Sequence, residues 1–570
     1  MEKRVVLFFL ISVAILGSWY FLFPPPKAVP PPPVPAAQEQ PKAPDAPAAA
    51  PGQVTPAPGA AAPVGGAREP EQRTTFDRPG LYHAVFSSVD AAPVEFTLLD
   101  KQYKITVDGK DLPIELIKKE AGRPPFVTAF AAGGADAERS DFDLPQGTAW
   151  KVVRASDEEV VYAADAGTVH VEKRWSVPKA GYSLGLEVTV ENKGDKPAQA
   201  RLLVAVDGYQ DPNVKAGGMS FGKRVNVTEG LCDVAGKLKN EGLEESQKKP
   251  LTESGDVKWV GYGEHFFLVA GALGGDALPR TCHIAGNAGG RIDVRAVYSP
   301  KSVAPGGRQS WSMAAFLGPK MLQILDDVTV PEASGPVDAR LADALNYRVL
   351  GIDLEFIARP MLFVLKKIHT VVLNWGVAII LITILLKLIT LYPTQKSMQS
   401  MKSMAKLKPE MDRIKEQFAD DKARQNTETM ALYKKHGVNP FGGCLPMLLQ
   451  MPIYMAFYAM LSNAVELYRA SFVGPIRDMT SDFWPLAVAT GILMFLQQRS
   501  SPQAADPQQR TMMYMMPIMF MAFTAMLPSG LTLYILTNTL LTMLHQWFMN
   551  RNDPDKRKVK EGKSPKPARA

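Results

Sequence analysis

Two patterns of apolar residues divide the chain. From about residue 76 to 325 apolar and polar positions alternate, as in Tyr182–Glu191. A period of two is typical of strands with one buried face. The turn-forming residues Asn192–Asp195 follow, and Ala200–Val206 is apolar again, so we expect a hairpin here. Many such strands without a strong helical pattern predict an antiparallel β-sandwich over residues 75–335.

Beyond Pro331 the pattern becomes helical, with long apolar runs. Residues 355–373 are apolar but carry Arg359, Lys366 and Lys367. Such charges favour an interfacial helix over a membrane crossing, and we place this helix with its linker in residues 336–374. Five later runs have the composition of crossings: Trp375–Tyr392, Gly443–Leu467, Phe483–Gln497, Thr511–Leu527 and Leu531–Met549.

The run Phe483–Gln497 is short for a crossing. Its 15 residues would span about 22 Å as a helix. The hydrocarbon core of a bilayer is about 30 Å thick. Local thinning of the bilayer is one way to absorb such a mismatch, and it would also lower the barrier to moving a polar segment across.

The amino terminus has the pattern of an uncleaved membrane anchor. Val5–Phe23 contains 19 uncharged, mostly apolar residues and runs directly into a proline cluster, without a small-x-small cleavage site. We therefore predict an anchor helix in residues 1–23 and an extended Pro/Ala-rich linker in residues 24–74. Together with five helices in residues 375–550, the chain is predicted to be a six-crossing membrane α-helical bundle carrying a β-sandwich domain.

Charge predicts the orientation. The net charge is +7, from 64 Lys and Arg against 57 Asp and Glu. Residues 393–442 hold ten Lys or Arg and the tail 551–570 holds eight, whereas residues 468–482 hold two. Because basic loops stay in the cytoplasm, both termini and the 393–442 loop are predicted inside and the β domain outside.

Most familiar enzyme signatures are missing from the sequence. The seven histidines form no HxxxH pair, and we find no nucleophile elbow, phosphate loop or dinucleotide fingerprint. We therefore predict no catalytic residue, metal, cofactor or nucleotide. Cys232 and Cys282 lie in the predicted external domain, where a disulfide is permitted, but spacing alone leaves open whether they meet.

Lys387 is a cation within an otherwise apolar crossing. Placing it there costs roughly 2.5–3.5 kcal/mol, so such residues usually face a polar cavity; the alternative is that its long stem reaches the headgroups. Thr383 lies one turn earlier on the same face. Together with polar residues of later crossings, it could line a hydrated groove with Lys387 at its base. Those residues are Gln450, Tyr534, Thr537 and Asn538.

The 393–442 loop itself is predicted to be structured. Lys396–Phe418 and Asp421–His436 each have a helical pattern, which predicts an antiparallel helical hairpin within residues 393–440. One interpretation is a solvated basic loop held by anionic lipids; the other is a mobile surface that contacts a client or partner. Twenty of the 25 methionines lie between residues 395 and 550, and such flexible side chains suit promiscuous apolar contacts.

Several short motifs resemble the YidC/Oxa/Alb membrane-protein insertase family, in order and spacing over about 355–550. They are Asn374-Trp375-Gly376, Tyr392-Pro393, Met430–Lys434, Asn439-Pro440, Gly442–Cys444, Pro446, Gln450–Pro452, Val465–Leu467, Asp506-Pro507, Pro517, Pro528–Leu531 and Tyr534. The resemblance implies five helices around a hydrophilic groove that is open to cytoplasm and lipid and closed outside. It implies a β-supersandwich for the external domain. The groove cation is usually Arg in this family and is Lys387 here, which keeps the charge but not the two-pronged hydrogen bonding. Ile535 stands at a groove position that is often aromatic in the family.

The resemblance implies an insertase and chaperone of the bacterial inner membrane, not an enzyme. A client helix would slide along apolar residues of two crossings: Met451, Met455, Met512, Met516 and Pro517. The basic hairpin and the tail 551–570 would receive nascent membrane proteins, a ribosome or a targeting factor. The hairpin residues concerned are Lys402, Lys406, Lys408, Arg413 and Lys415. A Sec translocon is a further expected partner, and free energy would come from client burial and membrane potential.

Two other classes of function remain open from the residues alone. A membrane-tethered carbohydrate-binding protein would place its chemistry in the β domain, so deletion of residues 76–325 would abolish function while Lys387→Ala would be silent. A small-solute transporter would use Lys387 as a substrate site. Transporters often show internal inverted repeats, and we see none in this sequence.

Overall fold

The computed structural model describes residues 70–107, 110–130, 140–214, 227–275, 279–332, 335–349, 351–438, 445–500 and 507–551. The predicted anchor (1–23), all but the end of the predicted linker (24–74) and all but the first residue of the basic tail (551–570) lie outside these ranges. The chain divides into two compact units, Met1–Pro70 and Glu71–Ala570, and the fold below is that of the second.

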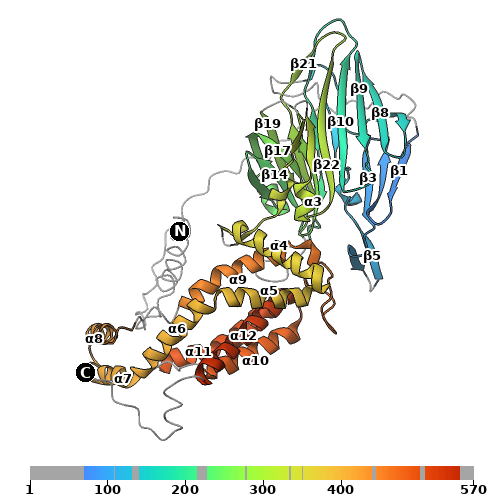
Figure 1. Cartoon of the computed structure of the whole chain (residues 1–570). Helices are drawn as coiled ribbons and strands as arrows, with labels where there is room; N and C mark the ends of the chain where they lie inside the picture. The colour runs from blue at the N-terminus through green and yellow to red at the C-terminus, as the bar shows by residue number, and fades with distance from the viewer. Residues whose placement is uncertain are drawn as a thin grey trace, which may run out of the picture. The chain divides into compact units, whose positions relative to one another are not determined.

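The largest sheet has nine strands, all paired antiparallel (Figure 1). In spatial order they are β15 (Lys237–Glu241), β14 (Glu229–Val234), β17 (Val257–Gly263), β18 (Phe267–Leu273), β22 (Arg308–Pro319), β10 (Ser183–Asn192), β9 (Val169–Ser176), β8 (Glu159–Ala166) and β7 (Lys151–Ala155). Burial alternates strictly along β10, as its sequence pattern predicts.

Two further sheets and three short pairs complete the β domain. The six-stranded sheet runs β16 (Leu251–Gly255), β19 (Arg280–Gly286), β20 (Arg291–Val297), β12 (Leu203–Ala205), β6 (Val127–Ala129), with β13 (Gly208–Tyr209) also on β20. The five-stranded sheet runs β1 (Arg73–Arg78), β2 (Tyr82–Ser87), β3 (Ala92–Leu98), β5 (Lys110–Glu115), β4 (Lys104–Val107). The pairs are β11 (Ala198–Ala200) with β21 (Lys301–Val303), β23 (Thr329–Glu332) with β24 (Gly335–Asp338), and β25 (Arg348–Val349) with β26 (Ile352–Asp353). Short helices α2 (Leu243–Lys248), α3 (Leu322–Asp326), η1 (Lys119–Ala121) and η2 (Leu341–Ala344) connect them.

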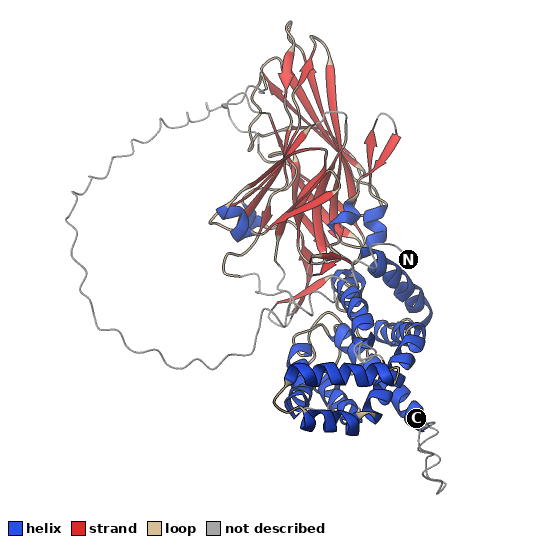
Figure 2. Ribbon diagram, turned by 90° about the vertical axis from the view of Figure 1, so that its left-hand side faces the viewer, coloured by secondary structure: helices blue, strands red, loops and turns tan. Residues whose placement is uncertain are grey.

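The sheets of this domain enclose a large apolar core. Trp175, Trp259 and Trp311 are almost fully buried in it. Gly230 of β14 lies so close to the six-stranded sheet that a Cβ there would meet the Ile284 side chain at 2.6 Å. Figure 2 shows the strands gathered in this layered arrangement. The predicted antiparallel β-sandwich is therefore confirmed.

A disulfide joins the two larger sheets. Cys232 lies in β14 and Cys282 in β19, and the bond connects Cα atoms that are 6.6 Å apart. Fifty positions separate the two residues in sequence. The disulfide therefore links two different sheets through residues that are distant in sequence.

Two predictions for this domain need correction. The expected hairpin of Tyr182–Glu191 with Ala200–Val206 does not form, because β10 pairs with β9 and β22, whereas β12 pairs with β20 and β6 in another sheet. The region predicted as linker from residue 336 is partly folded. It contains most of β24 and then η2, β25 and β26, with Leu341 and Tyr347 buried, so apolar contacts continue the domain beyond residue 335.

Helices make up the rest of the described chain (Figure 2). They are α4 (Glu355–Val372), α5 (Trp375–Ile389), α6 (Leu391–Lys406), α7 (Lys408–Gln417), α8 (Lys422–Lys435), α9 (Leu445–Asn463), the 3-10 turn η4 (Val465–Leu467), α10 (Trp484–Ser500), α11 (Pro507–Thr524) and α12 (Ser529–Arg551). Within these ranges, no single helix is both long and apolar enough to cross a membrane. Trp375–Ile389 and Leu391–Ser400 reach that standard as a pair bent by 59°.

Helix boundaries differ from prediction at the start of the predicted hairpin. The predicted crossing to Tyr392 ends at Ile389, and α6 begins at Leu391 with Pro393 in its first turn, where the missing N–H is tolerated. The helix predicted for Lys396–Phe418 is two helices, because Leu407 interrupts it ahead of Pro409 in α7. The segment predicted as the short fourth crossing is α10, with 17 residues in place of 15.

Candidate functional site

Lys387 lies in the last turn of α5 and faces α12. The Asn374 side chain caps the start of α5 by accepting a hydrogen bond from the Val377 amide. This cap sets the residue at which the helix begins. The Lys387 side chain is buried, and its Nζ donates to Thr542 Oγ1 at 2.6 Å. Thr542 in turn donates to the Asn538 carbonyl at 2.6 Å. The ammonium is thus directed at a hydroxyl of a neighbouring helix.

No carboxylate forms an ion pair with Lys387 among the residues that the structure describes. Its described surroundings include Thr542 and, one turn along α12, His545. Nδ1 of His545 is buried without a hydrogen-bond partner among described residues. A buried cation with only a neutral hydroxyl partner retains capacity to attract an acidic group.

A second polar group joins α9 to α12. Gln450 Nε2 donates to Tyr534 OH at 3.0 Å, and Asn538 Nδ2 donates to Tyr454 OH at 2.7 Å. The Tyr534 ring stacks on Phe457 with centroids 3.9 Å apart, and only 1% of Tyr534 is exposed. Both amides therefore meet a phenolic oxygen of the facing helix, so the polar atoms are satisfied within the bundle.

The structure brings together most of the predicted groove residues. Lys387, Gln450, Tyr534 and Asn538 belong to the two hydrogen-bonded groups, which share Asn538 through its backbone and side chain. Thr383 is buried on α5, but its hydroxyl donates to the Ile379 carbonyl of its own helix at 2.6 Å. Thr537 is half-buried on α12.

Sequence reasoning missed Thr542, Tyr454 and His545. Asn538, Thr542 and His545 are spaced four and three residues apart, so they repeat on one face of α12 and this periodicity could have found them. Tyr454 gave no such signal, because its neighbours in sequence are apolar and an aromatic residue is ordinary there.

The segment 468–482 joins the N-terminal ends of α5 and α12. Asn374 Nδ2 donates to the Phe472 carbonyl at 3.0 Å, and a Cβ on Gly376 would meet the Phe472 ring at 2.1 Å. The Asp478 carbonyl accepts from Ser529 Oγ at 2.9 Å, and the Gly530 amide donates to the Met479 carbonyl at 2.9 Å. Two of the sequence motifs, at 374–376 and 528–531, thus meet the same segment.

Glu466 forms an ion pair with Lys366. Its carboxylate lies 2.6 Å from Lys366 Nζ of α4, and the two side chains are 7% and 20% exposed. Lys366 also donates to Gln323 at 3.3 Å. The contact fastens α4 to η4, which follows α9.

The predicted client-contact residues differ in exposure. Met451 and Met516 are 37% and 41% exposed, and Met455 is half-buried. Pro517 is buried, so its ring is not available to a client in this arrangement. The Met512 side chain lies outside the described part of the structure.

The basic residues of the predicted hairpin lie on α6 and α7. Lys406, Lys408 and Arg413 are exposed and Lys415 is half-buried. Lys402 is in α6, and its side chain lies outside the described part of the structure. These helices precede α8, whose side chain Gln425 reaches the Lys415 carbonyl at 3.3 Å.

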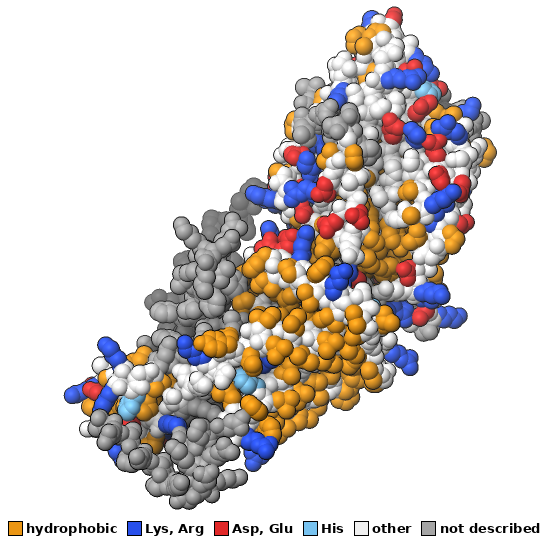
Figure 3. All heavy atoms as spheres, viewed as in Figure 1, with side chains coloured by type: hydrophobic (Ala, Val, Ile, Leu, Met, Phe, Trp, Pro, Cys, Tyr) orange, Lys and Arg blue, Asp and Glu red, His pale blue; other side chains and the backbone are white. Residues whose placement is uncertain are grey.

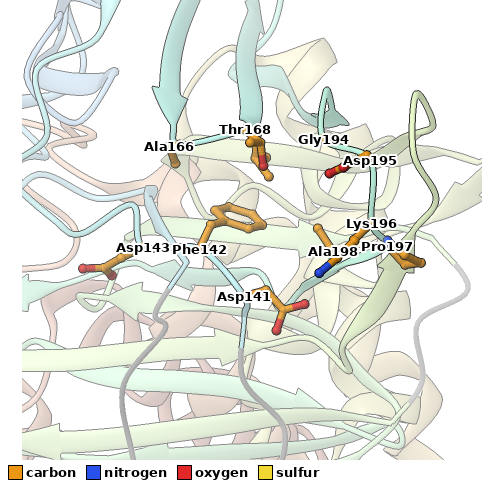
Figure 4. Close-up of a pocket in the computed structure, with 12 residues that line it drawn as sticks. Asp141, Phe142, Asp143, Ala166, Thr168, Gly194, Asp195, Lys196, Pro197 and Ala198 are labelled. Atoms are coloured by element: carbon orange, nitrogen blue, oxygen red, sulfur yellow. The ribbon is translucent and has the colours of Figure 1, made fainter.

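The β domain contains an open pocket of about 480 Å³ beside the turn after β8 and the loop after β10. Figure 4 shows the Phe142 ring in its middle and the Asp143 carboxylate directed away from it. Asp141 accepts the Gln199 amide at 2.7 Å, which gives it a structural role. The pocket brings no carboxylate pair together, and the described residues contain no group of three or more potential metal ligands.

Comparison with known proteins identifies the family. Residues 76–364 match the family described as YidC periplasmic domain, and residues 367–557 match the family described as 60Kd inner membrane protein. A membrane protein insertase YidC of Anaeromyxobacter sp. (strain Fw109-5) is 34% identical over 570 residues, which is 97% of each chain. This chain belongs to the YidC family of membrane protein insertases. The YidC of Syntrophus aciditrophicus (strain SB) is 31% identical, covering 97% of this chain and 100% of that one.

A solved YidC insertase with its first transmembrane domain resolved covers 85% of this chain and 95% of its own, at 18% identity and a TM-score of 0.35. The insertase function predicted from the sequence is confirmed by the YidC relatives, and this is not a family of enzymes. YidC similarity over nearly the whole chain leaves no support for the transporter or the carbohydrate-binding alternative.

Proposed function

We propose that this chain inserts and folds newly made inner-membrane proteins by holding their polar segments at the group formed by Lys387, Thr542, Asn538, Tyr534 and Gln450. The observation that carries the proposal is the buried ammonium of Lys387, which meets only a hydroxyl among described residues. An acidic client segment would supply the missing negative charge. The cation is only one turn from the end of α5, so a client would reach it from that end of the bundle.

The polar group is buried in this arrangement, so entry of a client requires α5, α9 and α12 to separate locally. Gln450 and Asn538 would then exchange phenolic partners for client backbone groups, which limits the cost of opening. The apolar part of the client would pack on exposed side chains such as Met451 and Met516. Burial of client apolar surface and the membrane potential would supply the free energy.

The topology proposed with this function places α5, α9, α10, α11 and α12 across the membrane and the α6–α8 hairpin in the cytoplasm. It is supported by ten basic residues in 393–442 against two in 468–482. The ends of α5 and α12 that meet segment 468–482 would then form a closed outer side. The exposed cations of α6 and α7 would contact a ribosome, a targeting factor or anionic lipid, with a Sec translocon as a further partner.

The test is insertion of a single-span client with a short acidic external tail in cells depleted of their own insertase. Lys387→Ala should reduce insertion at least about fivefold, because one ion pair is worth about 1 kcal/mol even in water. Lys387→Arg should insert normally. Lys151→Ala, which removes an exposed lysine of β7 in the β domain, is the matched control.

A client with a neutral tail distinguishes the loss of the Lys387 charge from a folding defect of the variant. Lys387→Ala should insert that client as well as the wild type does, and loss of both clients would mean a folding defect. Deletion of residues 76–325 should leave insertion largely intact if the β domain is auxiliary. Normal insertion of the acidic client by Lys387→Ala would overturn the role assigned to the ammonium.

A further inference from the structure

An open groove lies in the corner where α4 and α5 meet. It has a volume of about 380 Å³ and is almost entirely apolar. Its lining residues are Phe363, Val364, Lys367, Ile368, Val371, Val372 and Leu381. Neither the client-holding group nor the outer segment 468–482 includes any of these residues.

The described part of the chain leaves the groove face of α4 uncovered. Leu362 and Leu365 on the other face of the helix are 2% and 0% exposed, whereas Phe363 and Val371 are 61% and 81% exposed. Figure 3 shows apolar side chains gathered over the helical part of the molecule. Where the interfacial helix α4 would otherwise meet water, covering apolar area is favourable by roughly 25 cal/mol per Å², so an apolar chain has a driving force to occupy this face.

The groove also carries a positive charge that no described carboxylate neutralises. Two of the three cations of α4 are paired: Arg359 with Glu355 at 2.8 Å and Lys366 with Glu466 at 2.6 Å. Among described residues Lys367 has no carboxylate partner, and its Nζ lies 5.6 Å from the centroid of the Phe363 ring. The cation therefore stands beside apolar walls, which suits a ligand with one anionic end.

The apolar track continues away from the groove along α5. Leu381, Leu385 and Leu388 are 38%, 43% and 61% exposed and repeat at spacings of four and three residues on one face. They extend the track by about 10 Å at 1.5 Å per residue. The cation at one end and the narrow apolar track that leads away from it match the phosphate and one acyl chain of a phospholipid.

We propose that the α4–α5 groove binds an anionic phospholipid, with its phosphate at Lys367 and one acyl chain along Ile368, Val371 and the leucines of α5. A helix of a client or partner, about 10–12 Å across, is a poor match for a groove of this volume. The proposal assumes the membrane placement of α5 given above, but it requires no client and no insertion activity.

The test uses phosphatidylglycerol with a photoreactive group on its acyl chain, added to the full-length protein in nanodiscs, with crosslinked peptides mapped by mass spectrometry. Label should fall on residues 363–372 and 381–388 and should exceed that from the matching phosphatidylcholine probe several-fold. Lys367→Gln should lower the phosphatidylglycerol label about fivefold, the effect of one lysine near a membrane surface. Arg477→Gln, which removes an exposed cation of the segment 468–482, should not change it.

Ile368→Trp is a second variant that fills the groove and keeps Lys367. It should remove the label of both probes from the groove, and circular dichroism would verify that the helices remain. Equal labelling of Leu540 and Leu544, which are exposed on α12, would mean unselective lipid contact and would overturn the proposal. Unchanged label in Lys367→Gln would overturn the role of the charge. Normal client insertion by Lys367→Gln would show that the lipid site and the insertase site are separate.

Discussion

Lys387 and Lys173 are both buried, and their surroundings differ. Lys387 donates to a single hydroxyl, Thr542 Oγ1, whereas Lys173 in β9 donates to the carbonyls of Asp90 and Phe126 at 3.1 and 2.8 Å. Asp90 and Phe126 both have positive φ, near 62° and 63°. Lys173 therefore holds two residues in a backbone conformation that is costly for non-glycine residues.

Lys173 should make the stability of the β domain depend on pH. Burial lowers the pKa of Lys173 to about 7, with the Asp90 charge partly opposing the shift. Above that pH the folded state has lost a proton that the unfolded chain keeps until near 10.4. Stability should therefore rise between about pH 7 and 10, by up to about 1.4 kcal/mol per pH unit.

Urea unfolding followed by tryptophan fluorescence at several pH values would measure this slope. Trp150, Trp175, Trp259 and Trp311 are at most 4% exposed, whereas Trp484 and Trp547 are largely exposed, so the signal reports mainly on the β domain. Lys173→Met should remove the slope, although the two unpaired carbonyls will also lower stability at every pH. A slope that persists in Lys173→Met must come from other groups.

At the residue scale the sequence was a good guide to which polar side chains matter but not to their partners. A lysine, a glutamine and an asparagine in apolar helices stand out because burying a polar group is costly. All three belong to the observed hydrogen-bonded group. Their partners are less evident: Thr542 shares a face of α12 with Asn538, but nothing in the sequence distinguishes Tyr454. Which hydroxyl faces which amide depends on the packing of α9 against α12, and periodicity within one helix carries no information about that.

At the element scale, the junction of α5 with the segment 468–482 depends on a glycine, Gly376, which leaves room for Phe472. A Cβ on Gly376 would come within 2.1 Å of the Phe472 ring and 2.8 Å of its Cβ. Gly376→Ala should displace Phe472 and weaken the Asn374 bond to its carbonyl, with a loss of stability of about 1–3 kcal/mol. Thermal unfolding in detergent would measure the loss.

The double variant Gly376→Ala, Phe472→Ala distinguishes the steric clash with Phe472 from the effect of the alanine on helix propensity. It should be no less stable than Phe472→Ala alone, since alanine is favoured over glycine within helices. If Gly376→Ala costs the same in both backgrounds, the close approach to Phe472 is not the cause. Val473→Ala, at an exposed neighbouring position, is a suitable control.

The disulfide between β14 and β19 gives a simple chemical prediction. Maleimide labelling of denatured, unreduced protein should modify one thiol per chain, that of Cys444, and three after reduction. Cys282→Ser should leave two reactive thiols without reduction. Three thiols in the unreduced wild type would contradict the bond, whose removal should otherwise cost about 2–4 kcal/mol.

Element types were predictable because the period of apolar residues is set locally, whereas element pairing was not. Alternation from Tyr182 to Glu191 identified β10 correctly, but the following turn leads to another sheet. Likewise the crossing predicted to extend to Tyr392 ends at Ile389, and Pro393 lies in the first turn of the next helix, where a proline is tolerated. Pairing and helix breaks depend on contacts between residues far apart in sequence.

At the scale of the whole molecule, three sites with different chemistry are distributed over the helical part. The buried cation faces α12, the segment 468–482 joins the N-terminal ends of α5 and α12, and the apolar groove lies between α4 and α5. The first and the last are each built on α5, from Lys387 on one face and Leu381, Leu385 and Leu388 on another. Client and lipid could therefore bind α5 at the same time without competing for side chains.

This arrangement requires a defined orientation in the membrane, which single cysteines can test. In a Cys444→Ser background, Arg477→Cys and Val153→Cys should react with an impermeant maleimide in intact spheroplasts, whereas Arg413→Cys should react only after lysis. All three positions are exposed on the protein, so a difference reports membrane sidedness and not burial. Labelling of Arg413→Cys in intact spheroplasts would place the basic hairpin outside and would contradict the charge argument on which the topology rests. Because the client would reach Lys387 from the hairpin end of α5, that result would also remove the proposed cytoplasmic route to the cation.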